Sequence, residues 1–166
     1  MRLTHLDSEG KAKMVDVGEK QETTREARAF GQVKMSRDAY EQVRTGYGPK
    51  GDIFTVAKIA GIMGGKKTSD LIPLCHPLPI NVIDIDYVFK DSDCIVEIRS
   101  TAKTKAMTGV EMEAMTAVMI TALTIYDMCK AIDKGIELGP FYLLEKTGGK
   151  SGTYRRAPSK TVSGKP

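Results

Sequence analysis

Residues 110–133 read VEMEAMTAVMITALTIYDMCKAID, and this stretch decides the fold. Its unbroken run of apolar and small residues predicts one long, buried helix around which the rest of the chain packs. A buried helix needs no charges in order to pack, yet Glu111 and Glu113 stand at one end and Asp127 and Lys130 near the other. These four charges are therefore candidates for function.

One strand and two shorter helices are predicted ahead of this helix. Residues 24–35 alternate, with small residues on one side, as a strand does. Ser36 can cap a helix that stops at Gly46, and Asp52 can cap a second helix. We expect Gly64-Gly65 to end the second helix.

The rest of the chain reads as strands. Three prolines, Pro73, Pro77 and Pro79, exclude a long regular element before residue 80. Residues 81–90 and 94–101 alternate on either side of a turn and predict an antiparallel hairpin. A final strand is expected over 136–146, with a break at its Gly-Pro pair.

This order of elements predicts an α+β fold, in which one antiparallel sheet carries helices on one face. A ferredoxin-like sandwich is the simplest match. Residues 1–152 are expected to form a single catalytic domain. Residues 153–166, rich in Gly, Ser, Lys and Pro, are expected to be a disordered basic tail.

The net charge of +4 belongs to the end of the chain. Residues 147–166 carry five bases and no acid, which leaves residues 1–146 at −1. A nearly neutral globular part argues against specific nucleic-acid binding. A ferredoxin-like RNA-binding module, whose sheet aromatics stack on bases, is an alternative that the 6% aromatic content and the absence of Trp disfavour.

The cysteines and the apolar segments indicate the cellular compartment of the protein. Cys75, Cys94 and Cys129 form no CxxC pair, which argues against a disulfide framework or a zinc ribbon and favours a reducing cytoplasm. The start, MRLTHLDSEGK, has no apolar core of the signal-peptide kind. Residues 114–128 are fewer than the ~20 that span a bilayer. We expect a soluble, cytoplasmic protein with no membrane segment.

Asp127 and Lys130 are three residues apart, so their side chains share a helix face and can form an ion pair. One interpretation is a solvated pair near the helix C-terminus, where a lysine also favours the helix dipole. The other is a partly buried acid–base pair with shifted proton affinities. The apolar run before the pair, and Tyr126, Met128 and Cys129 around it, favour the second interpretation.

Glu111 and Glu113 suit the first turn of a helix, where carboxylates are favoured. They differ by about 200° around the axis, so one of them points where a solvated glutamate would not. Glu113 and Asp127 are 14 residues apart, or about 21 Å on a straight helix. One small substrate does not reach both in one chain. The spacing therefore predicts an active site shared between two chains.

The segment DLIPLCHPLP holds His76, which its flanking prolines stiffen. Cys75 and His76 are adjacent, so an extended chain points them to opposite sides and disfavours a Cys–His dyad. No second histidine lies nearby to bind zinc, and no metal site is expected. A structural histidine and a histidine held towards a polar ligand both remain open.

Basic residues lie beside the predicted turns: Arg25, Lys50, Lys66, Lys146 and Lys150. A lysine after a glycine pair is the kind of position where an ammonium group and main-chain amides meet a phosphate. The P-loop pattern GxxxxGK[ST] is absent. Together these residues predict an anionic ligand of the polyphosphate class.

Five segments resemble the cyclic pyranopterin monophosphate synthase family of molybdenum cofactor biosynthesis. They are MVDVGEKQETTREARA, KGDIFTVAKIAGIMGGKKTSDLIPLCHPL, TGVEMEAMTAV, ALTIYDMCKA and LLEKTGGKSG. The resemblance covers residues 3–152. It implies a ferredoxin-like fold, a hexamer made of three dimers with active sites at the dimer interface, and a lyase acting on phosphorus–oxygen bonds. The implied substrate is (8S)-3′,8-cyclo-7,8-dihydroguanosine 5′-triphosphate, and the products are cyclic pyranopterin monophosphate and diphosphate.

The resemblance also implies roles for individual residues. Asp127 and Lys130 of IYDMCKA match the catalytic acid–base pair. The residues that match or adjoin the substrate-lining positions are Leu74, Cys75, His76, Glu111, Met112 and Glu113. Those at basic positions that contact the triphosphate or base are Arg25, Lys50, Lys66, Lys146 and Lys150.

Two positions depart from the family pattern. Many relatives carry a basic residue where this chain has Met107, which puts a phosphate role there in doubt. Ser69, where some relatives have a bulky residue, is expected to affect packing alone. No cofactor is implied, and a Mg²⁺ accompanying the triphosphate stays open. A plain nucleoside-triphosphate hydrolase is the competing enzymatic interpretation.

Overall fold

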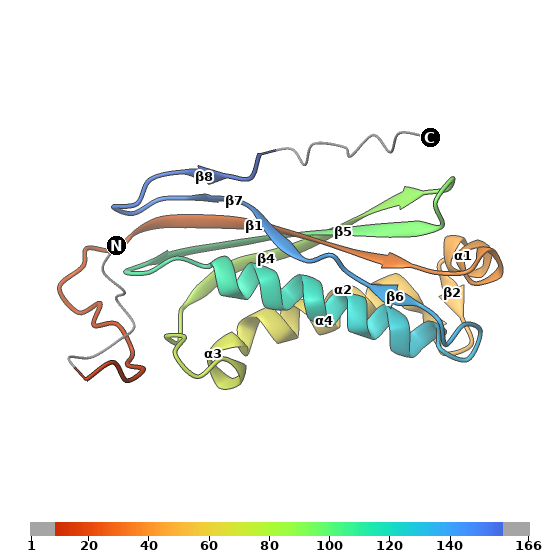
Figure 1. Cartoon of the computed structure of the whole chain (residues 1–166), viewed down its shortest axis with the longest axis horizontal. Helices are drawn as coiled ribbons and strands as arrows, with labels where there is room; N and C mark the ends of the chain where they lie inside the picture. The colour runs from red at the N-terminus through yellow and green to blue at the C-terminus, as the bar shows by residue number, and fades with distance from the viewer. Residues whose placement is uncertain (1–8, 158–166) are drawn as a thin grey trace.

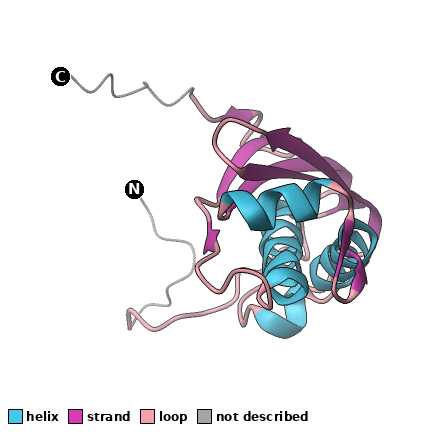
Figure 2. Ribbon diagram, turned by 90° about the vertical axis from the view of Figure 1, so that its right-hand side faces the viewer, coloured by secondary structure: helices cyan, strands magenta, loops and turns pink. Residues whose placement is uncertain are grey.

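The computed structural model describes residues 9–157. Its main sheet has the strand order β4-β5-β1-β7-β8, and every neighbouring pair is antiparallel. The helices α2 and α4 lie against one face of this sheet (Figures 1 and 2). The predicted α+β class is confirmed. The four long strands also have the order expected of a ferredoxin-like sandwich, because the first and third strands lie in the middle.

The predicted elements are present with small shifts in their bounds. The helices are α1 Arg37–Arg44, α2 Ile53–Lys66, α3 Thr68–Leu71 and α4 Glu111–Cys129. The main strands are β1 Thr23–Lys34, β4 Ile80–Lys90, β5 Ile95–Ala106 and β7 Tyr142–Thr147. The short strands are β2 Tyr47–Gly48, β3 Gly51–Asp52, β6 Glu137–Leu138 and β8 Tyr154–Arg155.

Both predicted N-caps are confirmed. The Ser36 side chain accepts a hydrogen bond from the Ala39 N–H at the start of α1, and the Asp52 carboxylate accepts one from the Thr55 N–H at the start of α2. These bonds satisfy main-chain donors that the first turn of a helix leaves free. The Asp52 cap also follows the small β2–β3 hairpin, whose turn carries Lys50.

The predicted end of α2 at Gly64-Gly65 is wrong, because the helix continues to Lys66. Both glycines are buried against α4. A Cβ at Gly64 would lie 2.7 Å from Ile120 Cγ1, and one at Gly65 would lie 3.1 Å from the Glu113 carbonyl oxygen. The glycines therefore allow two helix backbones to approach closely instead of ending a helix. These contacts also show that α2 and α4 run antiparallel.

The long helix α4 forms the centre of the core. Ala114, Ala117, Val118, Ala122 and Ile125 are fully buried against the sheet and α2. Among the described residues, α4 is the one helix long and apolar enough to cross a membrane. Its packing identifies it as a core helix.

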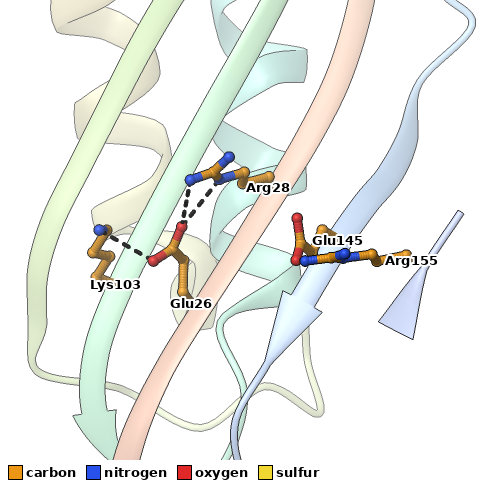
Figure 3. Close-up of polar contacts among 5 residues, drawn as sticks. All are labelled: Glu26, Arg28, Lys103, Glu145 and Arg155. Atoms are coloured by element: carbon orange, nitrogen blue, oxygen red, sulfur yellow. Dashed lines mark hydrogen bonds and ion pairs between the residues drawn. The ribbon is translucent and has the colours of Figure 1, made fainter. Parts of the chain in front are cut away.

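The face of the sheet away from the helices carries ion pairs (Figure 3). Glu26 lies between Arg28 at 3.0 Å and Lys103 at 3.1 Å. These partners, Lys103 first, hold the pKa of Glu26 below its usual range. Phe30 is buried and stacks on Tyr142 at 4.8 Å between ring centroids. The ring that an RNA-binding sheet would present to bases is therefore already covered.

The tail differs from its prediction. We expected disorder from residue 153, but Tyr154–Arg155 form β8, which pairs with β7. Arg155 reaches Glu145 at 2.9 Å (Figure 3), and the Arg156 guanidinium lies 4.2 Å from the Tyr142 ring centroid. Main-chain bonds and these two contacts offset the entropy of ordering the segment. The rest of the predicted tail, residues 158–166, lies outside the described residues.

Candidate active site

Three of the predicted site residues meet at the C-terminal end of α4. The Asp127 carboxylate lies 2.7 Å from Lys130 Nζ and 2.7 Å from Lys50 Nζ. Lys130 follows α4 on the same helix face, and Lys50 reaches in from the β2–β3 turn. We call Lys50, Asp127 and Lys130 the lysine cluster.

The lysine cluster is half-exposed, with 46–50% of each side chain accessible. Hydrogen bonds from Lys130 and then Lys50 lower the pKa of Asp127 to about 2, and Asp127 raises the pKa of Lys130. Both shifts favour the charged forms. In a single chain at neutral pH the cluster is thus one anion between two cations, open to solvent.

The two glutamates at the other end of α4 separate as the helix geometry predicts. Glu113 is 4% exposed, whereas Glu111 is partly exposed and forms an ion pair. Burial, and to a smaller extent the charge of Glu111, raises the pKa of Glu113 to about 7. The pKa of Cys75 is raised by burial and by the charge of Glu113, so Cys75 lies near that carboxyl group. The prediction that one glutamate avoids solvent is confirmed.

Basic residues surround the same end of α4. Glu111 Oε1 lies 2.7 Å from Lys146 Nζ at the end of β7. The Arg25 guanidinium, near the start of β1, donates to the carbonyl oxygens of Ala106 and Met107. A cavity of about 840 Å³ lies between them, and Lys150 also lines it. Strand β1, the turn after β7 and the first turn of α4 meet here (Figure 1).

The proline-rich loop belongs to this end as well. It follows α3, and Cys75 closes a turn through its main-chain bond to Ile72, with Leu74 and His76 on either side. Lys66 is exposed one residue after Gly65, which touches the Glu113 main chain. Met112 is 41% exposed. In the described part of the chain, no group of three or more His, Cys, Asp and Glu side chains is arranged to hold a metal ion.

The structure therefore brings the predicted residues together in two groups. Glu111, Glu113, Cys75, Arg25 and Lys146 surround the N-terminal end of α4, and the lysine cluster occupies the other end. Because α4 is continuous from Glu111 to Cys129, about 21 Å of helix separates Glu113 from Asp127.

Sequence analysis missed an exposed apolar surface between the two groups. Met119 and Leu123 are 47% and 54% exposed on α4, and Val56, Ile59 and Met63 are 41–53% exposed on α2. These five residues, the apolar stripe, recur at helical spacing. The signal was present in the sequence, since α4 is apolar on all sides and a helix of that kind is covered on all sides.

Comparisons with known proteins identify the family of this chain. The MoaC family model matches residues 14–149. Proteins named cyclic pyranopterin monophosphate synthase are similar along nearly the whole chain. The one from Heliobacterium modesticaldum is 55% identical over 93% of this chain and 97% of its own. Those from Peptoclostridium acidaminophilum and Bacillus subtilis are 51% and 48% identical over 94% and 95% of this chain, and 98% and 94% of their own.

The family match covers both ends of α4, the proline-rich loop and the first two residues after β7. The chain belongs to the MoaC family.

Proposed function

We propose that this chain converts (8S)-3′,8-cyclo-7,8-dihydroguanosine 5′-triphosphate to cyclic pyranopterin monophosphate and diphosphate, with Asp127 and Lys130 in acid–base roles. Family membership makes the chain a cyclic pyranopterin monophosphate synthase, an enzyme of molybdenum cofactor biosynthesis. The observation that carries the residue assignment is the pairing of Asp127 with Lys130 and Lys50 at 2.7 Å.

Two chains complete each active site in this proposal. Within one chain the lysine cluster and the buried Glu113 lie at opposite ends of α4. A twofold axis through the apolar stripe would pair the two α4 helices antiparallel, so each lysine cluster would meet the partner's Glu113 end. A twofold interface uses the same surface of both chains, and it would bury the stripe. Assembly of three such dimers into a hexamer is part of the same proposal.

A second chain would also shift the pKa values of Asp127 and Lys130. In one chain, solvent and the ion pairs keep Asp127 charged and Lys130 charged. Burial under a partner would raise the pKa of Asp127 and lower the pKa of Lys130, which brings both closer to neutral pH. Lys130 could then give a proton to the ring being rebuilt, and Asp127 could accept one.

The remaining residues bind the substrate. Leu74, Cys75, His76 and Met112 line the base, and Glu113 is a neutral donor or a charged acceptor close to physiological pH. Lys50, Lys66, Arg25, Lys146 and Lys150 stabilise the triphosphate. Ring closure requires a sugar oxygen to attack the α-phosphorus while diphosphate leaves, and these cations would stabilise the charge that develops.

The test is to incubate the purified chain with the cyclic nucleotide and follow both products. We expect a pterin and one equivalent of diphosphate. An opened nucleotide without a pterin would instead show a plain hydrolase. No consumption of the cyclic nucleotide by folded protein would refute the proposed reaction.

A further inference from the structure

The cavity at the N-terminal end of α4 is lined by four bases and by the acids Glu19, Glu26 and Glu111. Arg25, Lys146, Lys150 and Lys20 line it, and its volume of about 840 Å³ is that of a small-molecule site. Lys146 is already paired with Glu111. Within residues 9–157, Arg25 forms no ion pair, and its acceptors are two main-chain oxygens.

These two acceptors orient the Arg25 guanidinium. Nε lies 3.4 Å from the Ala106 oxygen and Nη2 lies 3.3 Å from the Met107 oxygen, so one edge of the planar group faces the end of β5. No described acceptor bonds Nη1. An arginine stays charged in a protein, and a planar guanidinium held in this way suits an anion with several oxygens.

The turn after β7 contacts the same guanidinium. Gly148 and Gly149 have φ values of +94° and +73°, which residues with side chains rarely adopt. A Cβ at Gly149 would overlap Arg25 Nη1 and would lie 2.5 Å from Cζ and 2.8 Å from Nη2. A Cβ at Gly148 would overlap the Thr24 carbonyl oxygen. The guanidinium therefore lies in space that only glycine at position 149 leaves free.

We propose that Gly149, supported by Gly148, is a positioning residue that holds the Arg25 guanidinium in the cavity to bind the diphosphate part of the substrate. This inference rests on the proposed function, since that reaction supplies a substrate with a diphosphate leaving group. Any side chain at Gly149 displaces the guanidinium from its two carbonyl acceptors. The family resemblance assigned no role to either glycine.

Titration of the purified full chain with inorganic diphosphate, followed by calorimetry, tests the proposal. We expect Gly149→Ala to weaken diphosphate binding about tenfold or more, as loss of an aligned charge-assisted contact does. Gly152→Ala is the matched control, because Gly152 also has a positive φ, +65°, and its Cβ would meet nothing within 4 Å. That control should bind diphosphate as the unmodified chain does.

A double-mutant cycle separates positioning from folding. Once Arg25→Ala has removed the guanidinium, adding Gly149→Ala should weaken diphosphate binding little further. Arg25→Lys keeps the charge but loses the planar group, and we expect it also to weaken binding about tenfold. Unchanged binding in Gly149→Ala or in Arg25→Lys would overturn the proposal, and so would equal losses in Gly149→Ala and Gly152→Ala.

Turnover measured on the same samples keeps the two proposals apart. If the unmodified chain forms no pterin, the proposed reaction fails whatever Gly149 does. If it forms pterin, and Gly149→Ala changes neither KM nor inhibition by diphosphate, the positioning role alone fails. We expect KM and the diphosphate inhibition constant to rise together in Gly149→Ala.

Discussion

The carboxyl groups at the two ends of α4 have opposite pKa shifts. At the C-terminal end, Asp127 is half-exposed between two lysines, which lower its pKa to about 2. At the N-terminal end, Glu113 is buried, and its pKa rises to about 7. At neutral pH the C-terminal end therefore carries a charged carboxylate, whereas the carboxyl group at the N-terminal end can lose its proton.

Neither end of α4 is therefore a complete acid–base site. A general acid or base works best when its pKa is near the operating pH, which the isolated lysine cluster does not provide. The buried end has such a group but lacks the Asp127–Lys130 pair. An antiparallel pair of α4 helices would give each site both.

The largest expected effect is on turnover at the C-terminal end. Lys130→Ala or Asp127→Ala should lower kcat roughly 10²–10⁴-fold, the usual contribution of a general acid or base, while the fold stays intact. Lys58→Ala is the control, because Lys58 forms a similar exposed ion pair with Asp84 at 2.6 Å. Pterin formation and circular dichroism measure the two properties. Full activity in either site variant would refute its catalytic role.

The second effect concerns the surface between the ends. Leu123→Asp places a charge in the apolar stripe, so we expect dissociation to monomers and loss of most pterin formation. Leu123→Met keeps the position apolar and should keep both assembly and activity. Light scattering measures the mass in solution. A monomeric Leu123→Asp chain with full activity would show that one chain suffices.

The third effect is a pH dependence at the N-terminal end. Glu113 ionises near 4.5 when unfolded and near 7 when folded, so ionisation opposes folding over that window. The free energy of unfolding should fall by up to about 3 kcal/mol between these pH values and then level off.

Glu113→Gln should remove that part of the pH dependence and leave the chain more stable than the unmodified one at pH 8. Glu111→Gln, which alters the partly exposed neighbour, should retain it. Urea denaturation at a series of pH values gives the comparison. A Glu113→Gln profile parallel to the unmodified one would mean that Glu113 does not carry a raised pKa.

The smallest effect concerns the packing of α2 on α4 between the two ends. Gly64→Ala forces a methyl group against Ile120 where α2 crosses α4, and overpacking of this kind costs about 1–3 kcal/mol. Ile59→Ala, on the exposed side of α2, serves as the control. Both variants are compared as monomers, because Ile59 belongs to the apolar stripe that the proposed dimer buries. Thermal unfolding measures both. Equal stability of Gly64→Ala and the unmodified chain would show that the close helix contact is not required.

The sequence predicted the helices and strands better than it predicted the contacts between them. Ser36 and Asp52 were recognisable as caps because capping acts over three residues, and α4 was recognisable from its apolar run. Gly64-Gly65 was misread because a glycine pair ends a helix or lets two helices touch, and only the tertiary contact with Ile120 distinguishes the two. Strand β8 was missed because two residues form a strand only where β7 already offers a free edge.

The site shows the same limit. Helix geometry alone predicted that one of Glu111 and Glu113 would be buried, and the burial of Glu113 confirms it. The partners Lys50 for Asp127 and Lys146 for Glu111 lie 77 and 35 residues away in the chain. No local pattern reports such pairings, since the packing of the β2–β3 hairpin and of β7 against α4 determines them. The sequence showed that α4 is apolar on all sides, but it did not show which face is the apolar stripe, because the exposed and buried faces have the same composition.

Mixing two inactive variants tests the shared site most directly. The Asp127→Ala variant lacks the carboxylate at the C-terminal end of α4, and the Glu113→Ala variant lacks the buried carboxyl group. Each variant alone should form very little pterin. After the two are unfolded and refolded together at equal amounts, half of the dimers would pair different chains, each with one intact site. We therefore expect about a quarter of the unmodified activity. A mixture as inactive as its components, although mass measurements show the chains paired, would contradict the account.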